Sequence, residues 1–170
     1  MDITRALLAG VASLAFVHSA AAADDHSLAQ EMQDRAAIDA LMWKYVRALD
    51  TLDAKAYAAV YTPDGQFGSG TNAEKGTAAL EKMITDLKDG RAKREAAGAA
   101  PTPAMYHVIF NHTLEFVDRD HARYDAYWST MFASSGQDQP PRVAAVGRSV
   151  DMLVRVNGKW LIQTRDVAPK

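Results

Sequence analysis

Residues 142–167 read RVAAVGRSVDMLVRVNGKWLIQTRDV, and this stretch decides the fold. Two runs rich in Val, Ile, Leu and Trp flank Asn157-Gly158, and an Asn-Gly pair in such a setting is a strong signal for a tight β-hairpin. Two runs of the same texture precede them, at residues 105–117 and 122–133. The second half of the chain is therefore predicted to be an antiparallel meander of four strands.

The first half of the mature sequence has the spacing of helices. Apolar residues recur along residues 28–49 at intervals of three and four, which predicts a long amphipathic helix with one stripe facing a core: Ile38, Leu41, Met42, Tyr45 and Leu49. A short second helix is expected from Asp53, an N-cap residue type, to Tyr61. Helices followed by an antiparallel meander favour an α+β domain with helices packed on one face of a curved sheet.

The segment between these two halves contains turn and helix signals. Residues 62–65 (TPDG) predict a turn, and residues 66–68 the start of a short strand. Residues 74–95 predict a third helix, interrupted at Gly90. The charged stretch 88–94 is interpreted as a solvated helix end, because the acidic Asp89 and Glu95 accompany its basic residues.

Composition excludes several functional classes. The chain has 170 residues, 48% of them hydrophobic and 24% charged, which suits one globular domain. Its formal charge of −2 lacks the basic excess typical of a nucleic-acid partner. Cysteine is absent, and the histidines do not fall at metal-ligand spacing. Neither a GxGxxG nor a P-loop pattern is present, so we expect no metal and no cofactor.

The N-terminus has the pattern of a targeting segment. Residues 6–17 form an apolar run of ALLAGVASLAFV, and alanines follow at 20–23. This layout predicts a secretory signal peptide over residues 1–23, a mature domain over 24–170 and a periplasmic or secreted location without membrane attachment. The run is shorter than the about 20 residues that span a bilayer. The alternative is an N-terminal helix that packs on the domain.

Two residues stand out as candidates for chemistry. His107 shares its predicted strand face with Ile109 and Asn111, whereas strict alternation would turn His112 to the opposite face. His107 is either a hydrogen-bonded structural residue or part of a pocket wall. Asp50 ends the long helix, where a carboxylate gains nothing from the helix dipole. It is either a turn residue or a carboxylate that orients a histidine for acid–base catalysis.

Three stretches, in this order, resemble the SnoaL-like proteins of the nuclear-transport-factor-two-like superfamily. The first runs from Ala37 to Phe67 and includes YVRALD and YTPDGQF, the second is Tyr106-His107 with Asn111 and Glu115, and the third is the closing hairpin. The resemblance implies a cone-shaped α+β barrel, in which a strongly bent antiparallel sheet wraps around N-terminal helices and encloses a deep pocket.

The resemblance also implies roles for particular residues. In catalytic members such as scytalone dehydratase, hexachlorocyclohexane dehydrochlorinase and bile-acid dehydratases, an Asp–His pair is the base, and Asp50 and His107 match it. Tyr45 matches a tyrosine of the bile-acid dehydratases, and Arg165 matches a pocket arginine of the dehydrochlorinase. The second pocket histidine of scytalone dehydratase, on a later strand, has no match here. The remaining candidate substrate-binding residues are Asn111, Phe67 and Tyr127.

The function that these observations favour is a cofactor-independent dehydratase or related lyase acting on a small molecule, with an isomerase as the nearest alternative. A non-catalytic protein that binds a small hydrophobic ligand is the rival from another class. A homodimer or higher homo-oligomer is also expected. Tyr124, Trp128 and Phe132 alternate along one strand, and they fit an outward dimer face or a core face equally well.

Overall fold

The computed structural model describes residues 17–134, 136 and 139–169. The chain divides into two compact units, residues 1–36 and residues 37–170. The described part of the first unit is the beginning of helix α1 (Val17–Asp50), and the second unit holds everything that follows. The predicted signal peptide falls outside the described residues as far as residue 16, and its boundary at residue 23 stays a prediction.

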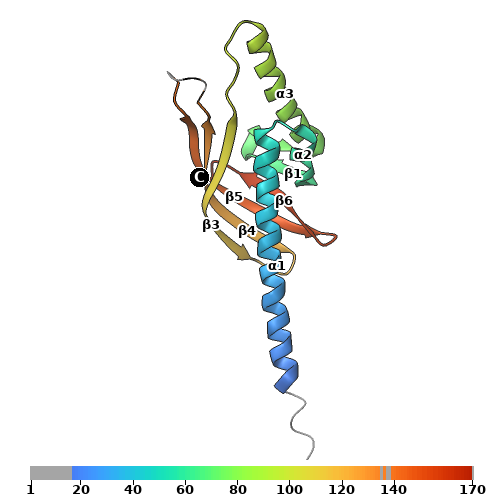
Figure 1. Cartoon of the computed structure of the whole chain (residues 1–170). Helices are drawn as coiled ribbons and strands as arrows, with labels where there is room; N and C mark the ends of the chain where they lie inside the picture. The colour runs from blue at the N-terminus through green and yellow to red at the C-terminus, as the bar shows by residue number, and fades with distance from the viewer. Residues whose placement is uncertain (1–16, 135, 137–138, 170) are drawn as a thin grey trace, which may run out of the picture. The chain divides into compact units, whose positions relative to one another are not determined.

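Helices precede the long strands along the chain, as the sequence predicts. The elements after α1 are α2 (Ala54–Ala59), β1 (Tyr61–Phe67), the 3-10 turn η1 (Gly70–Asn72), β2 (Glu74–Lys75), α3 (Thr77–Ala96), β3 (Met105–Phe116), β4 (His121–Phe132), β5 (Arg142–Val156) and β6 (Lys159–Asp166). Figure 1 shows the long strands β3 to β6 side by side. Within the described residues, no helix combines the length and apolarity needed to cross a membrane.

The six strands form one sheet in the order β2-β1-β6-β5-β4-β3. Neighbours are antiparallel except β1 and β6, which are parallel. The Asn-Gly hairpin is confirmed: Val156 pairs with Lys159, and Asn157 and Gly158 have φ angles of 51° and 77°, as a type I′ turn requires. The sheet is not closed, because β2 and β3 are its two edges, so the expected barrel is an open α+β sheet.

The middle of the chain differs from the prediction at two places. The predicted turn at 62–65 lies within β1, and the helix predicted over 74–95 is confirmed as α3 but begins only at Thr77, after strand β2. Pairing explains both, because β1 and β2 hydrogen-bond to each other and β1 also joins β6, a contact that local sequence does not reveal. Gly90 does not interrupt α3, which continues to Ala96. The cost of about 1 kcal/mol for a helical glycine is tolerated there.

The core lies between the helices and one face of the sheet. Its buried members include most of the predicted helix stripe and alternate residues of the later strands: Ile38, Leu41, Met42, Tyr45, Leu80, Ile84, Ala122, Tyr124, Ala126, Leu153 and Ile162. Tyr124 is 2% exposed, so this alternating set of β4 faces the core rather than outward. Burying each large apolar side chain contributes roughly 1.5–3 kcal/mol. This inner face of β3 and β4 carries the candidate site.

Candidate functional site

The end of α1 determines where the Asp50 carboxylate lies. The Asp53 N–H donates to the Ala48 carbonyl at 2.9 Å, and the Leu52 N–H donates to the Leu49 carbonyl at 3.2 Å. With Leu52 at φ 52°, these bonds form the Schellman motif that ends many helices in a left-handed residue. The chain therefore turns sharply just after Asp50, and Asp53 then caps α2 by accepting from the Ala56 N–H at 3.0 Å.

Asp50 and His107, which lie 57 positions apart in the sequence, meet at the inner face of β3. One carboxylate oxygen, Oδ1, accepts the backbone N–H of His107 at 2.8 Å and lies 2.9 Å from its ring Nδ1. The other oxygen lies 3.9 Å from Arg47 Nη1. The Asp50 side chain is 7% exposed and that of His107 is 17% exposed. The pair is thus largely shielded from solvent, although it can still be reached.

This geometry defines the chemistry available to the histidine ring. A carboxylate oxygen at Nδ1 favours the tautomer in which Nδ1–H donates, which leaves the lone pair on Nε2. The backbone N–H of His107 binds the same oxygen, which fixes the carboxylate relative to β3. Asp50 therefore holds both the main chain and the ring of His107. His107 therefore presents Nε2 as a base to whatever occupies the space on the other side of the ring.

His107 is one of the residues that line a small chamber of about 130 Å³. Three of the predicted site residues, Tyr45, Phe67 and Arg165, line it together with His107, and the remaining walls are Val46, Leu49, Ile109, Trp128, Thr130 and Val167. A groove of about 490 Å³ shares the walls Val46, His107 and Ile109. Ligand pockets commonly measure about 300–1,000 Å³, so the chamber itself accommodates only the reacting end of a substrate.

Arg165 brings a buried positive charge to the chamber. Its guanidinium contacts the Asp151 carboxylate on β5 and lies over the Tyr45 ring at 4.3 Å from the centroid. Both members of the ion pair are buried, and Arg165 Nε and Asp151 Oδ1 have no hydrogen-bond partner among the described residues. Burial raises the pKa of Asp151 to about 7, although Arg165 acts in the opposite direction. An incompletely satisfied cation therefore lies at the chamber wall.

Two other buried tyrosines, Tyr57 and Tyr61, pack against the Tyr45 ring. The Tyr57 and Tyr61 hydroxyls share a hydrogen bond of 3.1 Å, and the Tyr57 ring lies 5.5 Å from that of Tyr45. Burial raises the pKa of Tyr57 and the pKa of Tyr61 well above the ordinary value of 10.0. Both side chains are therefore neutral hydroxyls, and they fix the position of the Tyr45 ring under Arg165.

A β-bulge changes the face predicted for the second half of β3. Phe110 pairs with Tyr127 but Thr113 pairs with Asp125, so β3 has one extra residue there, and Asn111 has φ 47°. Beyond the bulge the alternation is reversed. His112 therefore lies on the same side as His107, lining the 490 Å³ groove and stacking on Tyr124 at 4.8 Å. The prediction that the two histidines face opposite ways is wrong.

Two predicted substrate contacts lie away from the chamber. Asn111 is an exposed residue of the bulge. Tyr127 is 51% exposed, and its ring stacks on Phe110 at 6.3 Å, on the outer face of the sheet. Its neighbour Trp128 lines the chamber instead and donates from Nε1 to the Val167 carbonyl at 3.2 Å. The structure thus places Asp50, His107, Tyr45, Phe67 and Arg165 together and leaves Asn111 and Tyr127 out.

Sequence reasoning missed three residues of this region: Trp128, Thr130 and Asp151. A signal for the first two was present, since they alternate with the buried Tyr124 and Ala126 along one strand. For Asp151 the signal was an acidic residue two positions from Leu153, on the same face of its strand. A buried acid of this kind needs a partner, and Arg165 is directly opposite it in the β5–β6 pairing.

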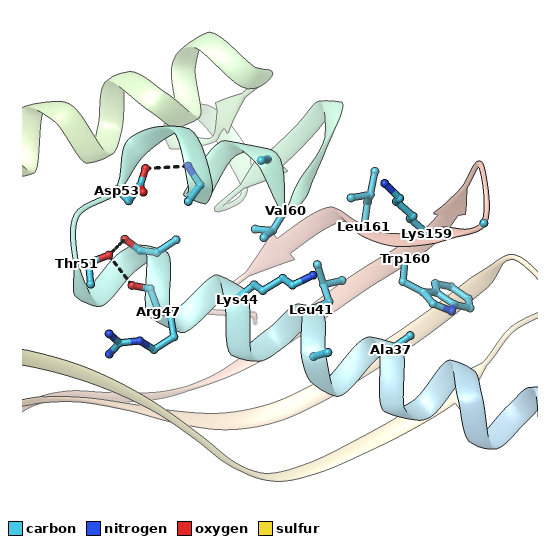
Figure 2. A pocket seen from close by; sticks show the side chains of 15 residues that line it. Ala37, Leu41, Lys44, Arg47, Thr51, Asp53, Val60, Lys159, Trp160 and Leu161 are labelled. Carbon is cyan, nitrogen blue, oxygen red and sulfur yellow. Dashed lines mark hydrogen bonds between the residues drawn. The ribbon is translucent and has the colours of Figure 1, made fainter.

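A larger groove lies on another side of α1 and holds neither member of the Asp–His pair. It measures about 870 Å³ and is lined by residues of α1, α2 and the β5–β6 hairpin. Figure 2 shows Lys44 and Lys159 extending along it, with Leu41, Val60 and Trp160 among its walls. In the part of the chain that is described, no group of three histidine or acidic side chains is arranged to hold a metal ion.

The fold is an α+β sheet of the nuclear-transport-factor-two-like kind, and a histidine lines its inner pocket. The SnoaL-like domain profile matches residues 30–166, and the chain belongs to that family. No curated protein sequence matches it.

Solved structures agree with this assignment. A protein of unknown function from Mycobacterium tuberculosis superposes with a TM-score of 0.67 and 21% identity, covering 84% of this chain and 75% of that one. An NTF2-like protein with a cystatin-like fold from Novosphingobium aromaticivorans gives 0.66 and 23%, covering 84% and 86%. A candidate scytalone dehydratase from the same organism gives 0.63 and 18%, covering 82% and 85%. At these identities the likeness establishes the fold alone.

Proposed function

We propose that this protein is a cofactor-independent enzyme that abstracts a proton from a small molecule, in a dehydration or related elimination. The observation that carries the proposal is the Asp50–His107 pair, in which one carboxylate oxygen binds both the ring Nδ1 and the backbone N–H of the histidine. Its support from the family is broader: a SnoaL-like chain is expected to bind or convert small molecules, and one structural neighbour is a candidate dehydratase.

The proposed reaction gives a role to each of four residues of the site. His107 Nε2 removes a proton from a carbon beside an activating carbonyl, and its C–H electrons form the new C=C bond as the leaving hydroxyl departs from the next carbon. Asp50 stabilises the imidazolium that forms. The Tyr45 hydroxyl, or a water molecule, protonates the departing oxygen. Arg165 stabilises the negative charge that develops on the carbonyl oxygen.

Two alternatives use the same site. An isomerase would return the proton from His107 to another carbon and expel no leaving group. A binding protein would hold a hydrophobic molecule without chemistry, which the apolar walls Leu49, Ile109 and Trp128 would also favour. The small volume of the chamber supports the enzyme over the binder, because a carrier needs to enclose its ligand.

Proton abstraction can be tested before the substrate is known. The protein is incubated in D2O with a panel of small β-hydroxy and β,γ-unsaturated carbonyl compounds, and deuterium at the α-carbon is followed by NMR together with the absorbance of a new conjugated C=C. Exchange with absorbance indicates elimination, and exchange with a moved double bond indicates isomerisation. Binding without exchange in any compound would favour the carrier and contradict the proposal.

The chain offers a matched control for the catalytic pair. His121 and Asp118 form a second His–Asp pair, also with 2.9 Å between Nδ1 and Oδ1, but on the surface. We expect His107→Ala to lower the exchange rate by about 10²–10⁴-fold, the range of general-base catalysis. Asp50→Asn should lower it too, and the double variant should add little because the two act as a unit. His121→Ala should leave the rate unchanged; an equal loss there would contradict the assignment.

We also propose that the protein is exported to the periplasm or the medium after removal of residues 1–23. The apolar run at 6–17 and the alanines at 20–23 support this. Mass spectrometry of the exported protein should find a chain that begins near Asp24, and a mature chain with Met1 intact would contradict the proposal.

A homodimer is proposed as the working form. The outer face of the sheet carries an exposed apolar patch, here called the outer patch, formed by Tyr106, Val108, Phe110, Tyr127, Val143 and Val146. Strand pairing makes these positions neighbours across β3, β4 and β5. Contiguous apolar surface of this kind commonly marks a contact between proteins.

A further inference from the structure

Three arginines converge on a cleft outside the chamber. The cleft measures about 730 Å³ and lies between the second half of α3, the segment 100–103 and the ends of β4 and β5. Arg91 and Arg94 enter it from α3 and Arg142 from β5, and Phe132 forms part of its wall. No acidic side chain is among its described lining residues. The cleft therefore concentrates positive charge in a protein whose net charge is −2.

The described contacts of these guanidinium groups compensate their charge only in part. Arg142 lies over the Phe132 ring at 4.5 Å and Arg91 lies 6.0 Å from the same ring centroid. The described hydrogen bond of the Arg91 side chain goes to Met105 Sδ, a weak acceptor, at 2.9 Å. The nearby Glu95 carboxylate accepts the Thr102 N–H at 2.9 Å.

Electrostatics supports the same reading. Burial lowers the pKa of Arg91 and repulsion from Arg94 lowers it further, whereas the nearby Glu95 carboxylate acts in the opposite direction. A favourable interaction with the α3 dipole accounts for Arg94 in the last turn. The helix dipole does not account for Arg142, which lies at the start of β5 and packs on the Phe132 ring. An anion between the groups would remove the repulsion.

We propose that this cleft binds an oxyanion, a carboxylate or phosphate group, through Arg91, Arg94 and Arg142. Guanidinium groups bind both kinds of anion with paired N–H donors, and three of them suit a group with several charged oxygens. Phe132 orients the donors by packing beneath Arg142, and Pro101 and Pro103 give the cleft a stiff wall.

The position of the cleft gives the site a role in substrate choice, and this step rests on the proposed function. Met105 pairs with Phe132, and His107 pairs with Thr130, so the cleft begins two residues along the same strand face from the catalytic pair. The preferred substrate would then carry an anionic group in addition to the carbon that His107 deprotonates.

Anion binding can be measured without any substrate. Isothermal titration calorimetry with inorganic pyrophosphate, and separately with citrate, at low and at physiological ionic strength, tests a phosphate source and a carboxylate source. We expect saturable binding of at least one of them, weaker at the higher salt concentration because salt screens charge. Arg91→Gln and Arg142→Gln should each weaken it about tenfold, as the loss of one charge-assisted contact predicts.

Controls separate this site from general charge and from the catalytic pair. Lys93→Gln removes one positive charge from the same helix at a residue that does not line the cleft, and it should leave the affinity within about twofold. If the Arg91 variant fails to fold, the exposed Arg94→Gln gives the same test. Absence of saturable binding, or equal losses in the Lys93 variant, would overturn the proposal. His107→Ala should leave anion affinity unchanged, so a failure of the catalytic pair can be distinguished from a failure of the cleft.

Discussion

At the scale of single residues, the position of Asp50 is determined by two features far apart in the chain. The Schellman motif ends α1 at this residue, and the β3 backbone supplies an N–H at 2.8 Å that a carboxylate oxygen can accept. A carboxylate at a helix C-terminus is unfavourable with respect to the helix dipole. The two bonds to His107 offset that cost, which is why an acidic residue is stable at this position.

Gly147 gives the first prediction at this scale. A Cβ added to it would lie 2.6 Å from Trp128 Cζ2, and Trp128 lines the chamber. Gly147→Ala should therefore push the indole away and lower the free energy of unfolding by about 1–3 kcal/mol, as overpacking does. Tryptophan fluorescence and urea unfolding would measure both effects.

Gly90 is the matched control for that substitution. It lies inside α3, and a Cβ there would lie 3.6 Å from Arg94 Nη1, an ordinary contact with a flexible side chain. Gly90→Ala should stabilise the protein by about 0.5–1 kcal/mol through helix propensity. If both alanine variants shifted stability in the same direction, the role assigned to Gly147 would be wrong.

The Asp151 carboxyl predicts a pH dependence of stability. Burial raises its pKa in the folded protein to about 7, compared with an ordinary value of 3.8. Between these values the unfolded chain has lost the proton and the folded chain still holds it. This contribution to the free energy of unfolding is therefore complete below about pH 4 and declines as the pH rises to about 7. Urea unfolding over this range should show the decline in the parent protein.

Asp151→Asn provides the comparison, because an amide does not titrate. As the pH rises from 4 to 7, the unfolding free energy of the parent should fall relative to that of this variant. Parallel curves would contradict the assignment of a raised pKa to Asp151.

At the scale of elements, the β3 bulge determines which side chains reach the inner face. Asn111 has φ 47°, a left-handed conformation that asparagine and glycine tolerate and β-branched residues do not. Asn111→Val should destabilise the protein by about 1–3 kcal/mol, and Asn111→Gly should be nearly neutral. Thermal unfolding would compare them, and equal losses in both variants would contradict the role given to the backbone conformation.

The four long strands could be predicted almost to the residue because they alternate and are punctuated by turns. The sequence predicts a strand over 105–117, and the structure has Met105–Phe116. The pairing of β1 with β2 and β6 could not be predicted, because those contacts depend on segments that are distant in sequence. The bulge was missed for a related reason: alternation assumes an unbroken ladder, and only the register with β4 reveals the extra residue.

Some residues of the candidate site could likewise be predicted from the sequence, and others could not. Asp50, His107, Tyr45 and Arg165 could be selected because polar residues interrupt apolar patterns or match a family motif. Tyr127 was chosen from the same strand as Trp128, and a shift of one position in a strand moves a side chain to the other face. The arginines of the cleft come from a helix and a strand that the sequence does not connect, so charge interleaving along 88–94 suggested only a solvated helix end.

At the scale of the whole molecule, the two faces of the sheet differ in what covers them. The inner face is covered by helices and carries the chamber, whereas the outer patch stays exposed on strands that also hold Trp128 and His107. Side chains alternate between the faces, so a partner packed on the outer patch would restrict the same backbone that positions the chamber. Association and activity are therefore expected to depend on each other.

Val146 gives the test of that association. It is 69% exposed on the β5 side of the outer patch, paired with Ser129 across the β4–β5 ladder. Val146→Lys would place two like charges near each other in a symmetric dimer, where the same patch of both copies meets, and should convert the dimer to a monomer in light scattering. Val117→Lys is the control, since Val117 is 59% exposed but follows β3 and lies outside the patch. A parent protein that is monomeric at micromolar concentration would contradict the dimer, and equal dissociation by both variants would place the interface elsewhere.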